Sequence, residues 1–270
     1  MSKIKLMAVV AGLHAGSTVG LLPPDFKTIE GTEVRQNAIQ QWLWTCWQDA
    51  LGYVHEIAGD DELALVNNGD SVEGVHHRTT QVISPDVQDH VNAAIALLDP
   101  LVKRASRFFV VRGTECHTNN REITIGKAMG AEINPEIGIP AFDRLTIDVN
   151  GVRCVFRHHM TTSMRTYLEA SAMSIHLAEE QLQAARNGEP IPRIVCAAHR
   201  HCHGYYGTAR EMFIVSPPWQ ALTRFGHKVV SDKRTKPGLY LLDWRGKKPG
   251  ELPEVHERLY DAPQPKAIKL

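Results

Sequence analysis

The chain has 270 residues, of which 43% are apolar and 22% charged, and its 30 basic side chains balance its 30 acidic ones. A chain of this length can bury a substantial core as one large domain or as two small ones. The composition excludes a collagenous, low-complexity or wholly disordered protein. Histidine is the exception, because 14 such residues contribute little charge at neutral pH and therefore indicate proton chemistry or metal ligation.

No targeting signal or membrane span is expected. Lysines precede a short apolar run at residues 6–10, but no small-residue cleavage site follows it, so residues 4–11 are expected to form a buried strand. No apolar stretch reaches the roughly 18 residues that cross a bilayer. The five cysteines are an odd number without an export signal, which argues against disulfides. We therefore expect a cytoplasmic protein without a membrane partner.

Short apolar runs alternate with helical periodicities along the chain, which is the pattern of an α/β domain. Strands are expected over residues 4–11, 63–66 and 108–111, in a hairpin over 141–158, and in short pieces over 194–260. Helices are expected over residues 33–58, 86–105 and 165–187, with Pro100 kinking or splitting the second of them. No repeat, linker or change in composition divides the sequence, so residues 1–270 are expected to form a single domain.

Histidines gather at or just beyond the ends of the expected strands, and Asp70 and Glu115 lie there too. They are His14, His76, His77, His117, His158, His159, His199, His201 and His203. Residues at the carboxyl ends of neighbouring strands converge on one edge of an α/β sheet. Imidazole and carboxylate ligands suit zinc, iron, manganese or nickel rather than calcium. A single histidine at a strand end is more often a turn or core residue, so the prediction of a metal centre depends on the whole set.

Five sequence blocks occur in an order that resembles the calcineurin-like metallophosphoesterases. They are Gly12-Leu-His14, Gly69-Asp70, Gly113-Thr-Glu-Cys-His117, His158-His159 and Ala198-His-Arg-His201. Longer segments, such as His76-His77-Arg-Thr-Thr-Gln and Pro217-Pro-Trp219-Gln, look like the phosphoesterases common in tailed phages and prophages. The resemblance implies a cytoplasmic location in a bacterial host if the protein is phage-encoded.

The resemblance also implies a four-layer α/β/β/α sandwich with two divalent ions (Mn, Zn, Fe or Ni) that are bridged by Asp70. The implied ligands are His14, Asp70 and His201 for one ion, and Asp70, His199 and either His158 or His159 for the other. In the family, an asparagine follows the glycine of the third block and a histidine follows the asparagine. Thr114 stands at the asparagine position here, so Glu115 is the expected substitute ligand and His117 the expected general acid.

The implied reaction is hydrolysis of a phosphodiester or phosphomonoester by attack of a metal-bound hydroxide. Two ions about 3.5 to 4 Å apart lower the pKa of a bound water and clamp the attacking and leaving oxygens. His117 would then protonate the departing alkoxide as a positioned imidazole. The rival enzyme class is a metal-dependent hydrolase of amides or lactones, which the order of the blocks disfavours.

Gly12 stands where the family carries a metal-binding aspartate. The substitution removes a ligand and a negative charge, so the first metal site is expected to be weak or empty. Three interpretations stay open: a one-metal enzyme, rescue by another ligand such as His76, His77 or Glu73, and an inactivated protein. The last interpretation leads to an alternative function, a non-catalytic phosphoesterase-fold module that binds nucleic acid or a protein partner.

Basic side chains gather between residues 224 and 248, where eight of them outnumber two acidic ones. Such an excess attracts nucleotide or nucleic-acid phosphates, although a solvated surface explains each residue singly. Trp219, Tyr205 and Tyr206 could stack on a base, whereas core packing is the commoner fate of aromatic side chains. Among phosphate esters, the sequence therefore favours a nucleotide or nucleic-acid phosphodiester as the substrate, and it indicates no oligomeric state.

Overall fold

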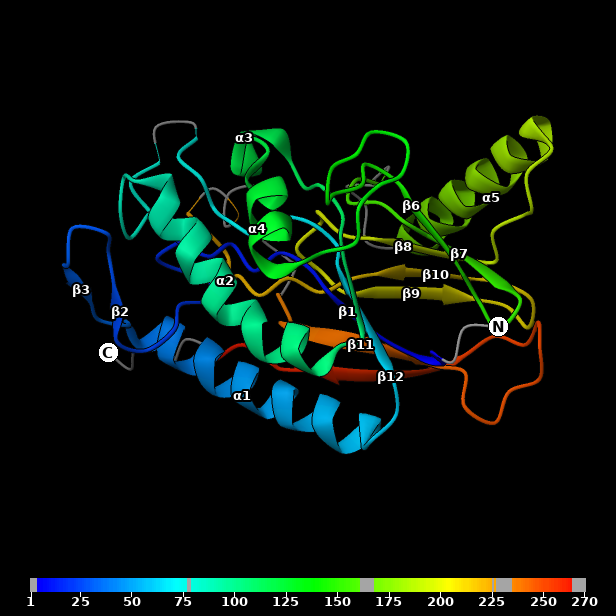
Figure 1. The fold of residues 1–270 in the computed structure, drawn as a ribbon, viewed down its shortest axis with the longest axis horizontal. Helices are drawn as coiled ribbons and strands as arrows, with labels where there is room; N and C mark the ends of the chain where they lie inside the picture. Colours follow the sequence, from blue (N-terminus) through cyan, green and yellow to red (C-terminus); the bar gives the residue numbers. More distant parts are fainter. Residues whose placement is uncertain (1–3, 77–78, 161–167, 225, 227–234, 264–270) are drawn as a thin grey trace, which may run out of the picture.

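The computed structural model of the chain describes residues 4–76, 79–160, 168–224, 226 and 235–263. Two five-stranded sheets form its centre (Figure 1). The first sheet has the order β12 (Glu254–Leu259), β11 (Gly238–Asp243), β1 (Leu6–Val10), β4 (Leu63–Asn67) and β5 (Arg107–Val110). The second has the order β6 (Leu145–Val149), β7 (Val152–Phe156), β8 (Ile194–Ala197), β10 (Met212–Val215) and β9 (Gly204–Gly207).

The remaining elements are five helices and a two-stranded ribbon in the described part of the chain. The helices are α1 (Ala38–Ala58), α2 (Val87–Arg104), α3 (Glu115–Thr118), α4 (Arg121–Met129) and α5 (Glu169–Asn187), and the ribbon pairs β2 (Phe26–Lys27) with β3 (Glu33–Val34). None of the described helices is long and apolar enough to span a bilayer.

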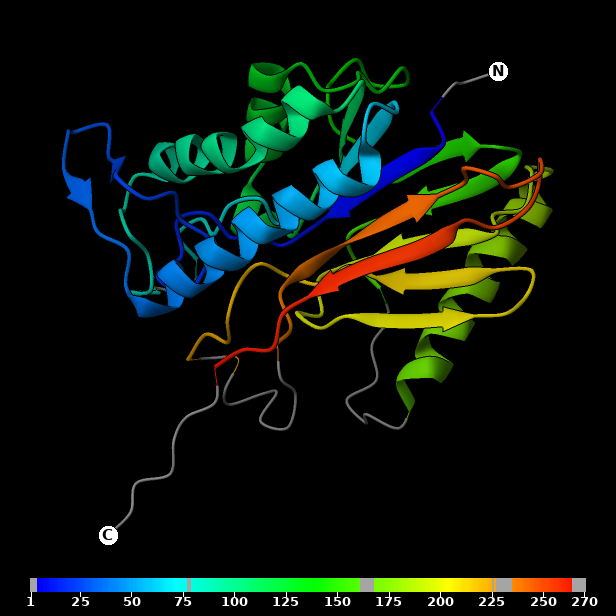
Figure 2. The same ribbon diagram turned by 90° about the horizontal axis from the view of Figure 1, so that it is seen from below.

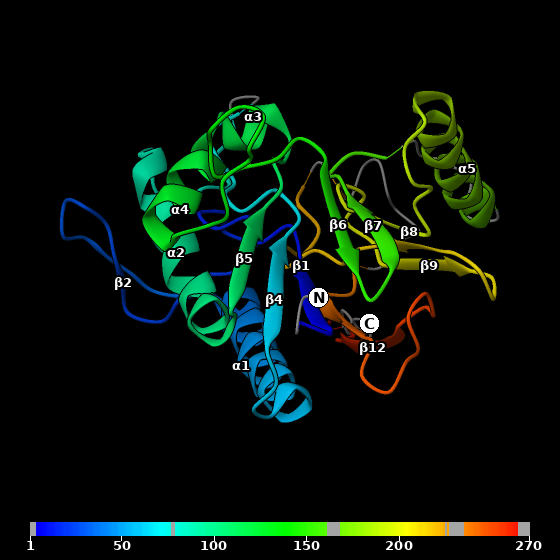
Figure 3. The same ribbon diagram turned by 45° about the vertical axis from the view of Figure 1, so that its right-hand side comes forward.

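Three apolar clusters fill the spaces between the sheets and helices. Helices α1, α2 and α4 cover one face of the first sheet, where Leu6 and Val10 pack in the same cluster as Trp47 of α1. The opposite face of this sheet meets the second sheet through a cluster that contains Val9 and Phe156. Helix α5 covers the outer face of the second sheet. Figure 3 shows this succession of helices, sheet, sheet and helix, and Figure 2 shows α1 and α5 on opposite sides of the molecule.

These clusters confirm the α/β fold class expected from the sequence. Every residue of β1 and β4 is buried, because both faces of the first sheet are covered. Such covered parallel strands read as continuous apolar runs rather than as alternating ones. Each fully buried leucine, valine or phenylalanine stabilises the fold by about 1.5 to 3 kcal/mol relative to an exposed side chain.

Helix α1 begins later than its periodicity predicts. The apolar pattern predicts a helix from residue 33, but α1 begins at Ala38 because Asn37 caps it. The Asn37 side chain accepts hydrogen bonds from the amides of Ile39 and Gln40, and the Gln40 side chain accepts one from the Asn37 amide. These reciprocal bonds satisfy amides that otherwise lack partners at the start of a helix.

The other expected elements occur with smaller changes. Helix α2 continues through Pro100 without a break. The helix expected from residue 165 is described from Glu169, because residues 161–167 lie outside the described residues. The hairpin turn at Asn150 and Gly151 has φ values of 50° and 77°, as a two-residue turn requires. The sequence periodicity does not predict α3 or α4, which follow β5.

Candidate metal centre

The candidate ligands lie on loops that follow five strands. Strands β1, β4 and β5 run parallel in the first sheet, and β7 and β8 run parallel in the second. His14, Asp70 and Thr114 follow the first three strands, whereas His158 and His199 follow the other two. The Asn68 side chain donates to the Cys196 carbonyl at 3.5 Å and so connects the ends of the two sheets. The carboxyl ends of both sheets therefore meet at one edge of the molecule.

The backbone at these ligands is strained. Eight described residues other than glycine have a positive φ, and five of them are Asn or Asp, which tolerate this conformation. The remaining three are His14 (φ 44°), His199 (69°) and His201 (51°), and Asp70 has a φ of 54°. Each such residue costs on the order of 1 to 3 kcal/mol, and residues of this kind cluster at functional sites. The strain therefore points to the same four residues as the sequence blocks.

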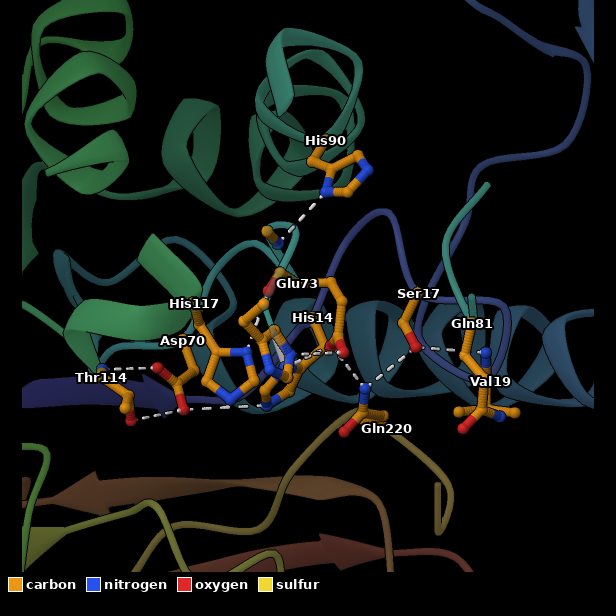
Figure 4. Close-up of polar contacts among 12 residues, drawn as sticks. His14, Ser17, Val19, Asp70, Glu73, Gln81, His90, Thr114, His117 and Gln220 are labelled. Carbon is orange, nitrogen blue, oxygen red and sulfur yellow. Dashed lines mark hydrogen bonds and ion pairs between the residues drawn. The ribbon is translucent and has the colours of Figure 1, made fainter. Parts of the chain in front are cut away.

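Asp70 lies at the centre of the site and is only 1% exposed. Its carboxylate accepts hydrogen bonds from the Thr114 amide (2.7 Å), the Thr114 hydroxyl (3.2 Å) and His158 Nε2 (2.9 Å), as Figure 4 shows in part. Burial alone would raise the pKa of Asp70, but the neighbouring imidazoles, His158 first, hold this pKa well below its usual range. Asp70 is therefore a carboxylate at neutral pH.

Two groups of three candidate ligands share Asp70. The first group is His14, Asp70 and His201, and the second is Asp70, His158 and His199. Within each group, one ligand atom of every residue lies within 4.8 Å of the others. Burial first, and then the charge of neighbouring histidines, lower the pKa of His199 to about 4 and that of His201 to about 3. Both rings are therefore neutral at pH 7, which is the form that binds a metal.

The polar atoms of the two groups fit divalent cations. His14 Nε2 is buried without a hydrogen-bond partner and lies 3.8 Å from Asp70 Oδ2. His158 directs Nδ1 to the Asn68 carbonyl (2.8 Å) and Nε2 to Asp70 (2.9 Å), so both of its nitrogens face acceptors. Burial alone would lower the pKa of His158, but the charge of Asp70 together with the hydrogen bonds to Asp70 and to the Asn68 carbonyl raises it.

A cavity of about 10 Å³ lies between the two groups, which is about the space that one water molecule needs. Its walls include His14, Asp70, His158, His199 and His201 together with Gly12 and Pro218. Imidazole and carboxylate donors around a small enclosed space are the ligand set of zinc, manganese, iron or nickel. The residues present therefore fit a divalent metal ion of this class.

Glu73 orients the ring of His14. Its carboxylate is 2% exposed and accepts hydrogen bonds from His14 Nδ1 (2.9 Å), His76 Nε2 (3.1 Å) and Gln220 Nε2 (2.7 Å). Gln220 also donates to Ser17 at 3.0 Å, so it lies between Ser17 and Glu73 (Figure 4). A histidine that donates one ring nitrogen to a carboxylate presents the other nitrogen to a metal. Glu73 therefore directs His14 Nε2 toward Asp70.

Gly12 lies in a place that disfavours the aspartate expected from the sequence resemblance. Its φ is 58°, and an added Cβ would lie 3.2 Å from both Cα and Cβ of Pro218. The Trp219 amide donates to the Gly12 carbonyl at 2.7 Å, which holds the two segments together. A carboxylate at this position therefore requires left-handed backbone and a displacement of the Pro218 segment.

The structure does not bring every expected residue into the two groups. Glu115 is exposed on α3 and belongs to neither. His159 is also exposed and outside the groups, although its ring centroid lies 4.5 Å from that of His199. His117 lies beside the first group, with its ring centroid 4.9 Å from that of His14. Its Nδ1 donates to the Glu73 carbonyl at 2.9 Å, which leaves Nε2 as an acceptor.

Two further residues hold the site together without belonging to the predicted set. Thr114 donates to Asp70, and its hydroxyl also contacts His199 Nδ1 at 2.9 Å. Glu122 is fully buried behind Asp70 and accepts from the amides of Gly113 (2.7 Å) and Ser71 (3.3 Å). Burial first, and then the charge of Asp70, raise the pKa of Glu122 to about 7. Thr114 could have been found from its place directly after Gly113, whereas no local motif indicates Glu122.

Comparison with known proteins gives likenesses of structure alone. No protein-family model matches the chain, and no curated protein sequence matches it. An archaeal phosphodiesterase aligns over 94% of this chain and 99% of its own with 10% identity and a TM-score of 0.46. Vps29 from Entamoeba histolytica in complex with Zn²⁺ aligns over 95% of this chain and 98% of its own, with 10% identity and a TM-score of 0.43. A predicted phosphoesterase from Streptococcus pneumoniae TIGR4 aligns over 94% of this chain and 98% of its own, with 11% identity and a TM-score of 0.36.

Proposed function

We propose that the protein is a metal-dependent phosphoesterase that hydrolyses a phosphodiester or phosphomonoester. The observation that carries this proposal is the sharing of buried Asp70 by two groups of ligands. His14, Asp70 and His201 would hold one ion, and Asp70, His158 and His199 the other. Divalent ions, when bound, neutralise phosphate charge and make water a nucleophile near neutral pH.

Neighbouring residues orient the candidate ligands and keep two of the imidazoles unprotonated. Thr114 fixes the Asp70 carboxylate through two hydrogen bonds, and Glu73 fixes the ring of His14. The low pKa values of His199 and His201 keep both rings unprotonated across the physiological range. Because these two rings need no deprotonation, metal binding at His199 and His201 does not compete with protons.

His117 is the side chain placed to act on the leaving group. It lies beside the first group and lines a separate pocket of about 450 Å³. Burial first, and then the charge of His14, lower the pKa of His117. Proton donation from Nε2 requires a ring that is protonated on both nitrogens, so this role is favoured at acidic rather than neutral pH.

The substrate class is part of the proposal. Much of the basic stretch between residues 224 and 248 lies outside the described residues. Within the described part, Lys236 pairs with Asp261, and Arg245 pairs with Asp61 and Asp243. Trp219 is fully buried, which contradicts a stacking role for its ring. These contacts weaken the case for a long nucleic-acid strand and leave a nucleotide-sized phosphate ester in the bacterial cytoplasm as the substrate we favour.

A panel of substrates tests the proposal directly. The purified protein is incubated with bis-p-nitrophenyl phosphate, p-nitrophenyl phosphate and a labelled DNA strand, each with added Mn²⁺, Zn²⁺ or Ni²⁺. We expect metal-dependent turnover of at least one phosphoester and none with Asp70→Asn. If no substrate is cleaved under any metal, the proposal fails.

Gly12 supports one second candidate, a non-catalytic module that binds nucleic acid or a protein partner. The missing carboxylate weakens the first metal group, and the contact with Pro218 blocks its simple return. This candidate predicts at most one tightly bound ion and no turnover in the same panel. Metal content and turnover, measured together, therefore separate the two functions.

A further inference from the structure

A third group of metal-binding side chains lies beside the two groups that share Asp70. His76, Cys116 and His117 each offer one ligand atom within 4.8 Å of the others. None of these atoms is needed by the His14, Asp70 and His201 group or by the Asp70, His158 and His199 group. We infer that His76, Cys116 and His117 form a separate site for a zinc-like divalent ion with an open fourth position.

The two imidazoles are already oriented for such an ion. His76 donates Nε2 to Glu73 Oε1 at 3.1 Å, and His117 donates Nδ1 to the Glu73 carbonyl at 2.9 Å. A metal-binding histidine almost always gives its other ring nitrogen to a carboxylate or a backbone carbonyl. One residue, Glu73, supplies both kinds of partner. His76 Nδ1 and His117 Nε2 are therefore the ligand atoms, and the ring centroids lie 4.2 Å apart.

The donor set indicates the class of ion. Cysteine sulfur and histidine nitrogen are the usual ligands of zinc, and three protein ligands with an open fourth position are typical of catalytic zinc sites. The sulfur of Cys116 disfavours magnesium, calcium and manganese, which prefer oxygen ligands. This chemistry differs from that of the groups around Asp70, which contain no sulfur. The third site therefore has a spectroscopic signature of its own.

Access and charge both suit an ion at this place. Cys116 and His117 line the pocket of about 450 Å³, whose wall also includes Gly74, Val75 and Val87. Cys116 is exposed, so an ion can enter from the solvent through this pocket. The buried carboxylate of Glu73 places a negative charge directly behind His76. The pocket beside Cys116 and His117 has room for a fourth ligand, either a water molecule or an anionic group.

The site changes the role of His117 if the proposed phosphoesterase function holds. An ion held by His117 would take the place of the proton that a general acid carries, and it would supply Lewis-acid stabilisation of negative charge on a leaving group. This catalytic consequence rests on the proposed function. The existence of the site does not, because it depends only on the three side chains and Glu73.

Cobalt provides the test, since Co²⁺ replaces Zn²⁺ and gives a thiolate-to-cobalt charge-transfer band when a cysteine binds it. The full-length protein is stripped of metal and titrated with Co²⁺ while absorbance is recorded in the near ultraviolet. We expect the band in the wild type and its loss in Cys116→Ser. Cys202→Ser is the matched control, because Cys202 is the only other described cysteine that is not buried, and we expect it to retain the band.

Two further variants separate this site from the proposed centre. Asp70→Asn is expected to retain the band, since Asp70 is not a ligand of the third site. His76→Asn is expected to weaken the Co²⁺ affinity reported by the band at least about tenfold, with circular dichroism confirming that the fold is kept. Absence of the band in the wild type, or its persistence in Cys116→Ser, overturns the inference whether or not phosphoesterase activity is found.

Discussion

The two halves of the candidate centre share Asp70 but differ in the hydrogen-bond partners of their imidazoles. In the half formed by Asp70, His158 and His199, each imidazole has a partner: His158 bonds the Asn68 carbonyl and His199 bonds Thr114. In the half formed by His14, Asp70 and His201, His14 Nε2 is buried without a partner. Gly12 adds no carboxylate there, because its backbone is left-handed and lies against Pro218.

Backbone strain, in contrast, occurs in both halves. Positive φ values occur at His14 and His201 in one half, at His199 in the other, and at Asp70, which both halves share. The fold therefore holds the ligands of both halves in unfavourable backbone conformations, whatever the charge of each half. We expect the two halves to differ in their affinity for a cation, and substitutions in each half test this expectation.

Asp70→Asn is expected to have the largest effect, because Asp70 belongs to both halves. The substitution removes the shared negative charge and with it several kcal/mol of transition-state stabilisation, or about 1,000-fold or more in turnover. Activity on bis-p-nitrophenyl phosphate and metal content by mass spectrometry measure the effect. Turnover within tenfold of wild type would contradict the shared role of Asp70.

Replacing one histidine in each half compares them directly. His199→Ala is expected to remove the ion that binds more tightly, with a loss of at least about 100-fold in its affinity. His201→Ala affects only the weaker half, so one ion per chain should remain at low metal concentration. Isothermal titration with Mn²⁺ distinguishes these outcomes. Equal losses in the two variants would show that the halves do not differ.

Glu73→Gln is expected to weaken the first half selectively. Loss of an orienting carboxylate behind a ligating histidine costs about 10- to 100-fold in metal affinity. Glu122→Gln is the matched control, since Glu122 is also buried but bonds the amides of Ser71 and Gly113 rather than an imidazole. The same titration should show a weaker second binding step in Glu73→Gln alone. An unchanged step would mean that Glu73 does not orient His14.

Gly12→Asp is expected to destabilise the protein instead of restoring a strong first half. Left-handed backbone and the close Pro218 atoms cost about 1 to 3 kcal/mol, with Asp near the lower end. Gly12→Ala is the control, because it adds the Cβ without the carboxylate. Urea unfolding in the presence of a chelator measures both variants. A Gly12→Asp protein of wild-type stability with a second tightly bound ion would disprove this expectation.

Glu115→Gln is expected to have the smallest effect. The exposed side chain belongs to neither half, so the metal content and turnover should stay within about twofold of wild type, as for surface substitutions away from a site. If Glu115 replaces the missing asparagine as a metal ligand, as the sequence predicts, the variant should instead lose metal and turnover. Metal analysis of the variant therefore decides between Thr114 and Glu115 in the second half.

Parallel strands explain why much of the centre could be predicted from sequence. Apolar runs identify β1, β4 and β5, and the carboxyl ends of such strands converge on one edge of the sheet. His14 and Asp70 follow from this rule together with their positions after the runs. The structure accordingly brings them together with His158, His199 and His201.

The residues that the sequence did not reveal depend on the direction of a turn or on long-range contact. Helix α3 begins immediately after Thr114 and turns Glu115 outward, and no periodicity marks a helix of four residues. Gln220 reaches Glu73 across 147 positions of the chain. Pro218 restricts the side chain that position 12 can carry, and the two residues meet only in the folded chain. Local patterns contain none of this information.

Strand β1 has its two neighbours at very different distances along the chain. β4 pairs with it on one side, but β11, which ends at Asp243, pairs with it on the other. During synthesis, all five candidate ligands of the two halves leave the ribosome before β11 does. Until β11 follows, one edge of β1 stays open to pairing with other chains. A nascent or truncated chain that ends near residue 220 therefore contains all five candidate ligands but lacks β11. We expect such a chain to fail by aggregation through the unpaired edge of β1 and not by the absence of a ligand.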